Sequence, residues 1–209
     1  MFANLPFNYI VLVILSMVIS IPIHEVMHGF AARALGDTTA EEAGRLSFNP
    51  LRHVDIWMTI ILPAVLLLLH VSPIFIAKPV PFNPRNVRYG EYGAALVGLA
   101  GPFTNLVLAV LAALLLRFSG MDATAGFGVA LDIFIQINLV LFVFNMIPFP
   151  PLDGSRLLYA VAPEPLQRVM YQLESAGLGI TILVLLIIAP LISPIVINIT
   201  NGIYTFLLR

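Results

Sequence analysis

Cysteine is absent from this sequence, and charged residues are scarce. Without cysteine the chain can form no disulfide and offers no thiolate ligand, so any metal ion must be held by histidine and carboxylate side chains. Only 10% of the residues are charged, whereas soluble domains carry about a quarter. The net charge of −1 gives no electrostatic reason to expect a nucleic-acid partner.

Apolar residues make up 60% of the 209 residues, and the mean hydropathy is +1.00, which predicts an integral membrane protein. Because a spanning helix needs about 20 mostly apolar residues, six spans are predicted, at residues 6–34, 54–71, 91–118, 127–147, 174–189 and 191–208. Pro190 and Pro194 mark either a tight turn between the last two or a kink within one segment, so five spans is the alternative. No polar stretch is long enough for a soluble domain. Residues 1–209 are therefore predicted to form one all-α, polytopic membrane domain.

Three connections between the predicted spans are informative. Residues 36–53 are polar, in a loosely alternating order that is compatible with short strands. Residues 72–90 contain four prolines and cannot form a continuous helix. Residues 148–156 place three prolines directly after an apolar run. Since irregular backbone near membrane depth survives only where it is buried in protein or lines a wet cavity, residues 148–156 are a candidate cavity wall.

The sequence His-Glu-Val-Met-His at residues 24–28 follows the uncharged stretch 9–23 with no polar loop between them. Imidazoles at positions i and i+4 lie on one face of a helix at a spacing that can hold one zinc ion, and the intervening glutamate can act on a metal-bound water. If the helix begins near Leu5, His24 lies about 28 Å along it, well inside the bilayer. Ionisable groups at that depth indicate function. The alternative is a pair of interior histidines that form hydrogen bonds between helices.

A catalytic zinc ion usually has three protein ligands, so a third must come from elsewhere in the chain. His53 lies in a polar loop and His70 at the far end of the second span, which makes both poor candidates. Asp153 stands out among the acidic residues because it follows the proline-broken segment and precedes Gly154, where backbone can approach an ion closely. Its alternative role is to cap a short helix that starts at Ser155.

The motif HEVMH at 24–28, together with NMIPFPPLDG at 145–154, resembles the site-2 protease family of intramembrane metalloproteases. That family is marked by H-E-x-x-H and a later N-x-x-P-x-x-x-L-D-G, and both are complete here. Residues 44–50, 77–81 and 100–105 resemble segments of its compact bacterial and archaeal members, without a PDZ or CBS domain. The resemblance covers about residues 20 to 160 of a core predicted at 6–160, while the C-terminal helices (174–208) match only as apolar spans.

The resemblance implies one zinc ion per chain, bound by His24, His28 and Asp153, with Glu25 as general base. Two histidines and one carboxylate leave an open coordination position, at which the pKa of a bound water falls towards about 7. Glu25 can take a proton from that water and pass it to the leaving amide nitrogen. The resemblance also implies a small membrane-associated β element after the first helix, at residues 38–49, whose edge could receive an unwound substrate.

Three asparagines in the predicted spans have either a functional or a structural interpretation. In the family, the residue matching Asn145 is thought to hold the substrate or the oxyanion, whereas the alternative is a hydrogen bond between helices. Asn105 follows Gly98 and Gly101, and small residues at that spacing permit close helix packing, so this group is interpreted as mainly structural. Asn138 is expected to pack within the bundle.

The function predicted from these residues is a zinc-dependent intramembrane endopeptidase that cuts membrane-anchored proteins. Its expected partners are such substrates and the lipid bilayer, with no nucleic acid, and its expected location is a prokaryotic plasma membrane. The first alternative is another multi-spanning H-E-x-x-H protease, against which the L-D-G motif argues. The second is a metal transporter or a non-catalytic metal-binding protein, which would need more polar residues along the spans or the loss of Glu25 or a ligand.

Overall fold

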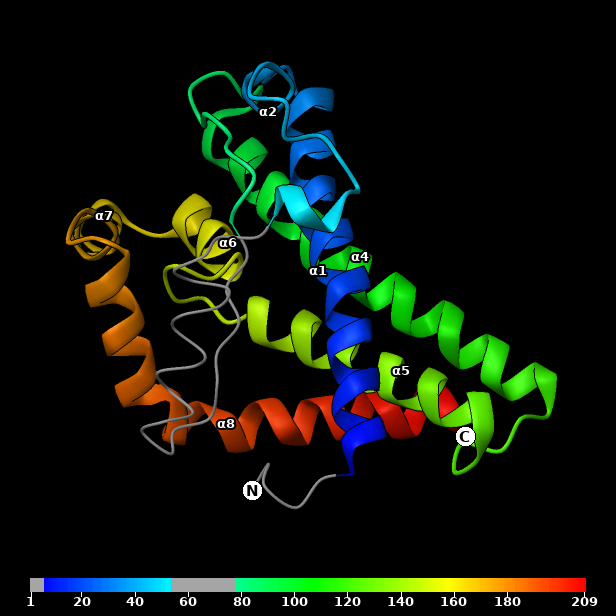
Figure 1. The fold of residues 1–209 in the computed structure, drawn as a ribbon. Helices are drawn as coiled ribbons and strands as arrows, with labels where there is room; N and C mark the ends of the chain where they lie inside the picture. Colours follow the sequence, from blue (N-terminus) through cyan, green and yellow to red (C-terminus); the bar gives the residue numbers. More distant parts are fainter. Residues whose placement is uncertain (1–5, 54–77) are drawn as a thin grey trace.

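The computed structural model describes residues 6–53 and 78–209, and every regular element in these two ranges is helical (Figure 1). The elements are α1 (Phe7–Ala34), α2 (Thr39–Glu42), the 3-10 turn η2 (Pro50–Arg52), α4 (Gly90–Ser119), α5 (Gly126–Asn145), α6 (Gly154–Val161), α7 (Glu164–Ser175) and α8 (Leu178–Leu208). Four of them, α1, α4, α5 and α8, are long and apolar enough to cross a membrane. The predicted all-α membrane fold is confirmed for these residues, and the predicted span 54–71 lies outside them.

Helix α1 turns its polar side inwards. Its buried residues include Ser16, Ser20, His24 and His28, which recur every four residues and therefore share one face. Large apolar side chains cover the opposite face, where Ile14 and Val18 are 50% and 44% exposed. A helix of a soluble protein has the reverse arrangement, so this polarity fits a helix with lipid on one side and the protein interior on the other.

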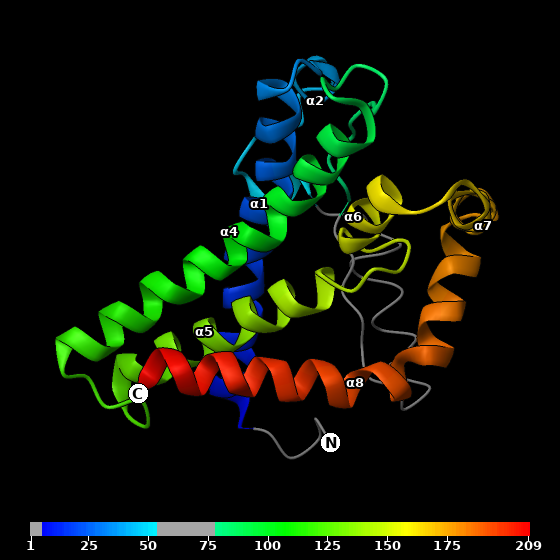
Figure 2. The same cartoon turned by 180° about the vertical axis from the view of Figure 1, so that it is seen from behind.

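Helices α4 and α5 form the centre of the bundle, and α8 packs across α5 (Figures 1 and 2). Small side chains at Ala109, Ala112 and Ala113 let α4 approach the buried side chains of Leu131 and Ile135 on α5. Small residues at such contacts are typical of membrane bundles, where close van der Waals packing replaces the hydrophobic effect between helices. Helix α4 also contacts both α1 and α6, which brings the helix containing HEVMH close to the helix that follows Asp153.

The C-terminal apolar region is one helix, so the predicted division into spans at 174–189 and 191–208 is wrong. Pro190 and Pro194 both lie inside α8, and the helix bends visibly about them in both overall views (Figures 1 and 2). Each proline removes one backbone hydrogen bond and bends the helix, while the neighbouring turns keep theirs. The structure therefore adopts the kinked single segment. The count of six is not borne out, since the described ranges contain four candidate spans.

The predicted β element at residues 38–49 is also wrong: these residues contain the short helix α2 and irregular backbone, with no strand. Nearby side chains form hydrogen bonds with backbone N–H and C=O groups that would pair with a neighbouring strand in a sheet. Asp37 accepts hydrogen bonds from the backbone and hydroxyl of Thr39, which starts α2, and His53 contacts the carbonyl of Ser47 at 2.7 Å. The alternating polarity of this stretch reflects turns rather than a pleated edge.

Asp37 connects the end of α1 to the segment that precedes α4. Its carboxylate is fully buried and accepts hydrogen bonds from the backbone of Asn83 at 2.6 Å and from the side chain of Asn86 at 3.2 Å. The chain just before Asn83 is thereby held close to the C-terminal turns of α1, which carry the two histidines.

Candidate metal centre

His24 and His28 lie one turn apart on the buried face of α1, with residue exposures of 6% and 8%. Their Nε2 atoms face one another at 3.1 Å, and the two rings meet edge to face. The spacing expected from the H-E-x-x-H sequence is thus realised inside the protein.

Asp153 joins the two histidines from the start of α6. Its Oδ2 atom lies 3.1 Å from Nε2 of His24 and 3.4 Å from Nε2 of His28. Although Asp153 occupies the N-cap position, its side chain makes no capping hydrogen bond, so the capping alternative is wrong.

The three side chains fit a zinc ion. One ligand atom from each of His24, His28 and Asp153 lies within 4.8 Å of the other two. Oδ2 of Asp153 is buried and has no hydrogen-bond partner among the described residues. A buried carboxylate oxygen without a partner is costly, and a cation between the three groups would remove that cost. Two imidazoles and one carboxylate are also a donor set that catalytic zinc accepts.

Hydrogen bonds at Nδ1 fix the orientation of both imidazoles. Nδ1 of His24 lies 2.6 Å from Oδ1 of Asn105, and Nδ1 of His28 lies 2.7 Å from the carbonyl oxygen of Val97. Since these oxygens can only accept, each Nδ1 donates, and each Nε2 keeps its lone pair for the space shared with Asp153.

The mainly structural interpretation of Asn105 from sequence does not include its contact with His24. Its amide donates to Oδ1 of Asn138 at 2.9 Å, and the amide of Asn138 donates to Ser20 at 2.9 Å, so one chain of hydrogen bonds joins α4, α5 and α1. The expectation that Asn138 packs within the bundle is confirmed, since it is fully buried. The signal that could have identified Asn105 is its amide in an otherwise apolar helix, four residues after Gly101.

Glycine lets α4 pass directly beside the metal group. A Cβ atom at Gly101 would lie 2.3 Å from Nε2 of His28 and 2.7 Å from Cε1 of His24. One turn earlier, a Cβ at Gly98 would lie 3.0 Å from the carbonyl oxygen of Asp153. The close packing predicted from these glycines therefore occurs at the metal centre itself.

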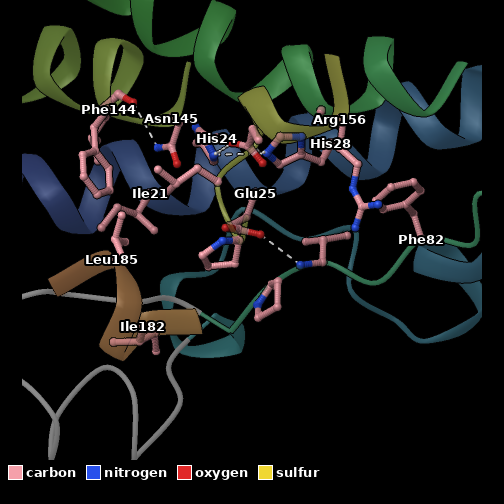
Figure 3. Close-up of a pocket in the computed structure, with 17 residues that line it drawn as sticks. Ile21, His24, Glu25, His28, Phe82, Phe144, Asn145, Arg156, Ile182 and Leu185 are labelled. Carbon is pink, nitrogen blue, oxygen red and sulfur yellow. Dashed lines mark hydrogen bonds and ion pairs between the residues drawn. The ribbon is translucent and has the colours of Figure 1, made fainter. Parts of the chain in front are cut away.

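Glu25 borders the same cavity as the three candidate ligands. It is half-buried, and its Oε2 accepts a hydrogen bond from the backbone N–H of Val80 at 2.9 Å. Val80 belongs to the proline-rich segment before α4, and Pro79 and Phe82 of that segment also line the cavity. The bond holds the carboxylate of Glu25 in the cavity, as Figure 3 shows.

Asn145 is the last residue of α5 and also lines the cavity. Its amide donates to the carbonyl oxygen of Leu141 in its own helix at 3.0 Å, which is not the interhelical bond considered as an alternative from sequence. The cavity of about 340 Å³ is thus lined by the five residues predicted to bind the metal or to act in catalysis, which are His24, Glu25, His28, Asn145 and Asp153. Figure 3 shows Asn145 and Phe144 at one end and Arg156 and Phe82 at the other.

Comparison with known proteins agrees with this arrangement. Residues 119–189 match the sequence profile of "Peptidase family M50", a range that contains Asn145 and Asp153. The chain is 37% identical over 183 residues to "Putative zinc metalloprotease YwhC" of Bacillus subtilis, covering 84% of this chain and 80% of that protein. It is 32% identical over 186 residues to "Putative zinc metalloprotease Rip2" of Mycolicibacterium smegmatis, covering 87% and 70%. No solved structure gives a significant match.

Proposed function

This chain belongs to peptidase family M50, the site-2 protease family, and from that membership we propose that it is an intramembrane endopeptidase that cuts membrane-anchored proteins. In coarser terms it is an integral membrane zinc metalloprotease. One observation carries the proposal: the side chains of His24, His28 and Asp153 converge inside the protein. The buried Oδ2 atom of Asp153 has no hydrogen-bond partner among the described residues.

His24, His28 and Asp153 hold one zinc ion per chain in this proposal. Zinc supplies Lewis acidity, which lowers the pKa of a coordinated water towards about 7 and polarises a peptide carbonyl. Asn105 and the carbonyl of Val97 keep the two imidazoles turned so that Nε2 faces the ion.

Glu25 acts as the general base. Its carboxylate lies in the same cavity as the ligands, and the N–H of Val80 at 2.9 Å restricts its rotation. Glu25 accepts a proton from the attacking water and returns it to the nitrogen of the departing amine. A position sheltered from bulk water strengthens this electrostatic assistance.

Asn145 orients the substrate from the other side of the cavity. Its amide now donates to Leu141 within α5, and rotation of the side chain would let it donate instead to the carbonyl oxygen of a substrate peptide bond. A donor at that place stabilises negative charge that develops on the oxygen.

The substrate class follows from the position of the cavity. His24 and His28 lie on an apolar helix that can span a membrane, so a peptide bond reaches them most readily from a membrane-anchored chain. A substrate helix must unwind before cleavage, because its peptide groups are otherwise engaged in internal hydrogen bonds. The proposed location is a prokaryotic plasma membrane, which the chain crosses several times as a single domain, with no nucleic-acid partner.

The test compares zinc content and cleavage of a membrane-anchored substrate for the wild-type chain and Glu25→Gln. We expect Glu25→Gln to retain about one zinc ion per chain and to lose at least about a hundredfold in kcat, since it keeps the ligands but cannot take a proton. The matched control is Glu41→Gln, whose carboxylate pairs with Arg33 at the surface and should leave both measurements unchanged. Undiminished proteolysis by Glu25→Gln, or a wild-type chain without zinc, would contradict the proposal.

A further inference from the structure

Arg156 brings a positive charge into the wall of the metal-site cavity. It follows Asp153 by one turn of α6, and its side chain is 30% exposed, so it is reached both from the cavity and from solvent. Its stem packs against α4 at Gly98, where a Cβ would lie 3.0 Å from Cβ of Arg156. The stem is therefore fixed, while the guanidinium extends along the cavity.

The guanidinium group is only weakly engaged. It lies over the ring of Phe82, 5.9 Å from the centroid, and its Nη2 is 3.5 Å from each carboxylate oxygen of Glu174 on α7. A partly exposed ion pair of that length contributes little to stability. With respect to the described residues, most of the five N–H groups of Arg156 are thus available to a further acceptor.

The two ends of the cavity differ in chemistry. Phe144, Leu185 and Ile182 make one end apolar, while Arg156 and Phe82 form the other. His24, Glu25 and His28 lie between them (Figure 3). A peptide that crosses the candidate catalytic residues must therefore place apolar residues on one side of the scissile bond and a group that suits a cation on the other. This is the pattern of a spanning segment that continues into a polar flank.

We infer that Arg156 forms a subsite for an acidic side chain in the flanking segment of the substrate, and that Glu174 occupies this subsite while no substrate is bound. Glu174 already shows that a carboxylate fits beside this guanidinium. An Asp or Glu of the substrate replaces the weak Arg156–Glu174 ion pair by an ion pair of better geometry, because Arg can bind a carboxylate through two parallel hydrogen bonds. This inference rests on the proposed endopeptidase function and adds a substrate preference to it.

The experiment uses the full chain, loaded with zinc and reconstituted in liposomes, with single-span peptide substrates. Each flank position of the substrate is changed in turn to Asn, Asp or Lys. We expect one position, or two adjacent ones, at which Asp lowers KM about tenfold relative to Asn, the value of one charge-assisted hydrogen bond. At the same position Lys should raise KM.

Variants of the ion pair distinguish a subsite from a structural contact. Arg156→Gln should raise KM for the Asp substrate about tenfold, to the value for Asn, and Arg156→Glu should shift the preference to Lys. Glu174→Gln should have the opposite effect and lower KM for the Asp substrate several-fold, because it removes the internal competitor. The control is Arg168→Gln, which removes an exposed pair with Glu164 within α7 and should leave the preference intact.

The possible results separate this inference from the proposed function. A wild-type chain that cuts Asn and Asp substrates equally at every flank position overturns the subsite but not the protease. Equal losses for Arg156→Gln and Glu174→Gln on all substrates, with zinc content unchanged, also overturn it, because the pair would then only join α6 to α7. Absence of cleavage by the wild-type chain, or cleavage by Glu25→Gln, counts against the endopeptidase itself.

Discussion

At the scale of single residues, the candidate metal centre depends on groups that are not among its three candidate ligands. The amide of Asn105 and the carbonyl of Val97 turn the imidazoles, and the absence of a side chain at Gly101 leaves space at Nε2. All three belong to α4, so this helix sets the position and orientation of the two histidines of α1. Such neighbours of the ligands commonly change metal affinity by about ten- to a hundredfold when they are altered.

Gly101→Ala tests this arrangement directly. The added Cβ would lie 2.3 Å from Nε2 of His28, so either the ring or α4 must move. We expect zinc affinity to fall at least about tenfold, in line with loss of ligand orientation, as measured by competition with a chelator. Gly202→Ala on α8 is the control, since no described atom lies within 4 Å of its added Cβ. Equal affinities for the two variants would show that Gly101 does not shape the centre.

Site residues are predictable from the sequence where a motif is local or is accompanied by a second motif. HEVMH placed His24 and His28 on one helical face by spacing alone, whereas Asp153 remained either a ligand or a cap until the family resemblance favoured the ligand. The amide of Asn105 in an apolar helix predicts a polar partner, but that this partner is His24 could not be predicted, because the contact joins residues 81 positions apart. No local pattern reports which of several buried asparagines meets which histidine.

At the scale of elements, the connection between α1 and α4 depends on one carboxylate. Burial alone would raise the pKa of Asp37, but hydrogen bonds from Thr39, Asn83 and Asn86 outweigh burial and hold that pKa below its usual value. Because the folded value is lower than the unfolded one, the ionised carboxylate stabilises the fold at neutral pH. The same carboxylate keeps the segment containing Val80 close to Glu25.

Asp37→Asn should therefore destabilise the protein in a pH-dependent way. We expect a loss of about 2 kcal/mol at pH 7, the order of one charged hydrogen bond to a buried group, observed as a lower midpoint of thermal unfolding. The stabilisation is fully present above the unfolded pKa of about 3.9 and disappears as the pH falls through the lower folded value, so wild type and variant should converge there. Asp122→Asn is the matched control, since Asp122 accepts similar bonds from Thr124 at an exposed turn. A difference between wild type and Asp37→Asn that is constant with pH would contradict this role.

The predicted elements agree with the structure where the length of an apolar run defines a helix. They are wrong where prolines or alternating polarity had to be interpreted. Spans at 6–34, 91–118 and 127–147 correspond to α1, α4 and α5 within a few residues. At Pro190 and Pro194 the sequence allows either a turn or a kink, and the six-span prediction rests on the turn, whereas in the structure α8 continues through both prolines. Residues 38–49 alternate in polarity like a strand, but a strand needs a partner, and only tertiary structure shows whether one is near.

At the scale of the whole molecule, polarity is inverted relative to a soluble protein. The interior contains a chain of hydrogen-bonded polar groups from Ser20 through Asn138 and Asn105 to His24. The outside of α1, α4 and α8 instead carries large exposed apolar side chains, among them Val18, Leu111 and Leu191. In water this surface would be an aggregation hazard. In a bilayer an apolar outer surface is expected. The hydrophobic effect does not drive helices together in lipid, so the buried polar network helps to hold them together.

A single charge placed on the outer face should therefore be far more damaging than one placed on a loop. Val18 is 44% exposed within α1, and Val18→Lys should cost about 2.5–3.5 kcal/mol of membrane insertion. We expect this variant to be depleted from the membrane fraction after alkaline extraction. Leu51→Lys changes a side chain that is 79% exposed in η2 and should accumulate in the membrane like the wild type. Val18→Leu, which keeps the apolar surface, should do the same. If Val18→Lys inserted and bound zinc as well as these controls, the outer face of α1 would have to contact protein or water, and the depth assigned to His24 and His28 would be wrong.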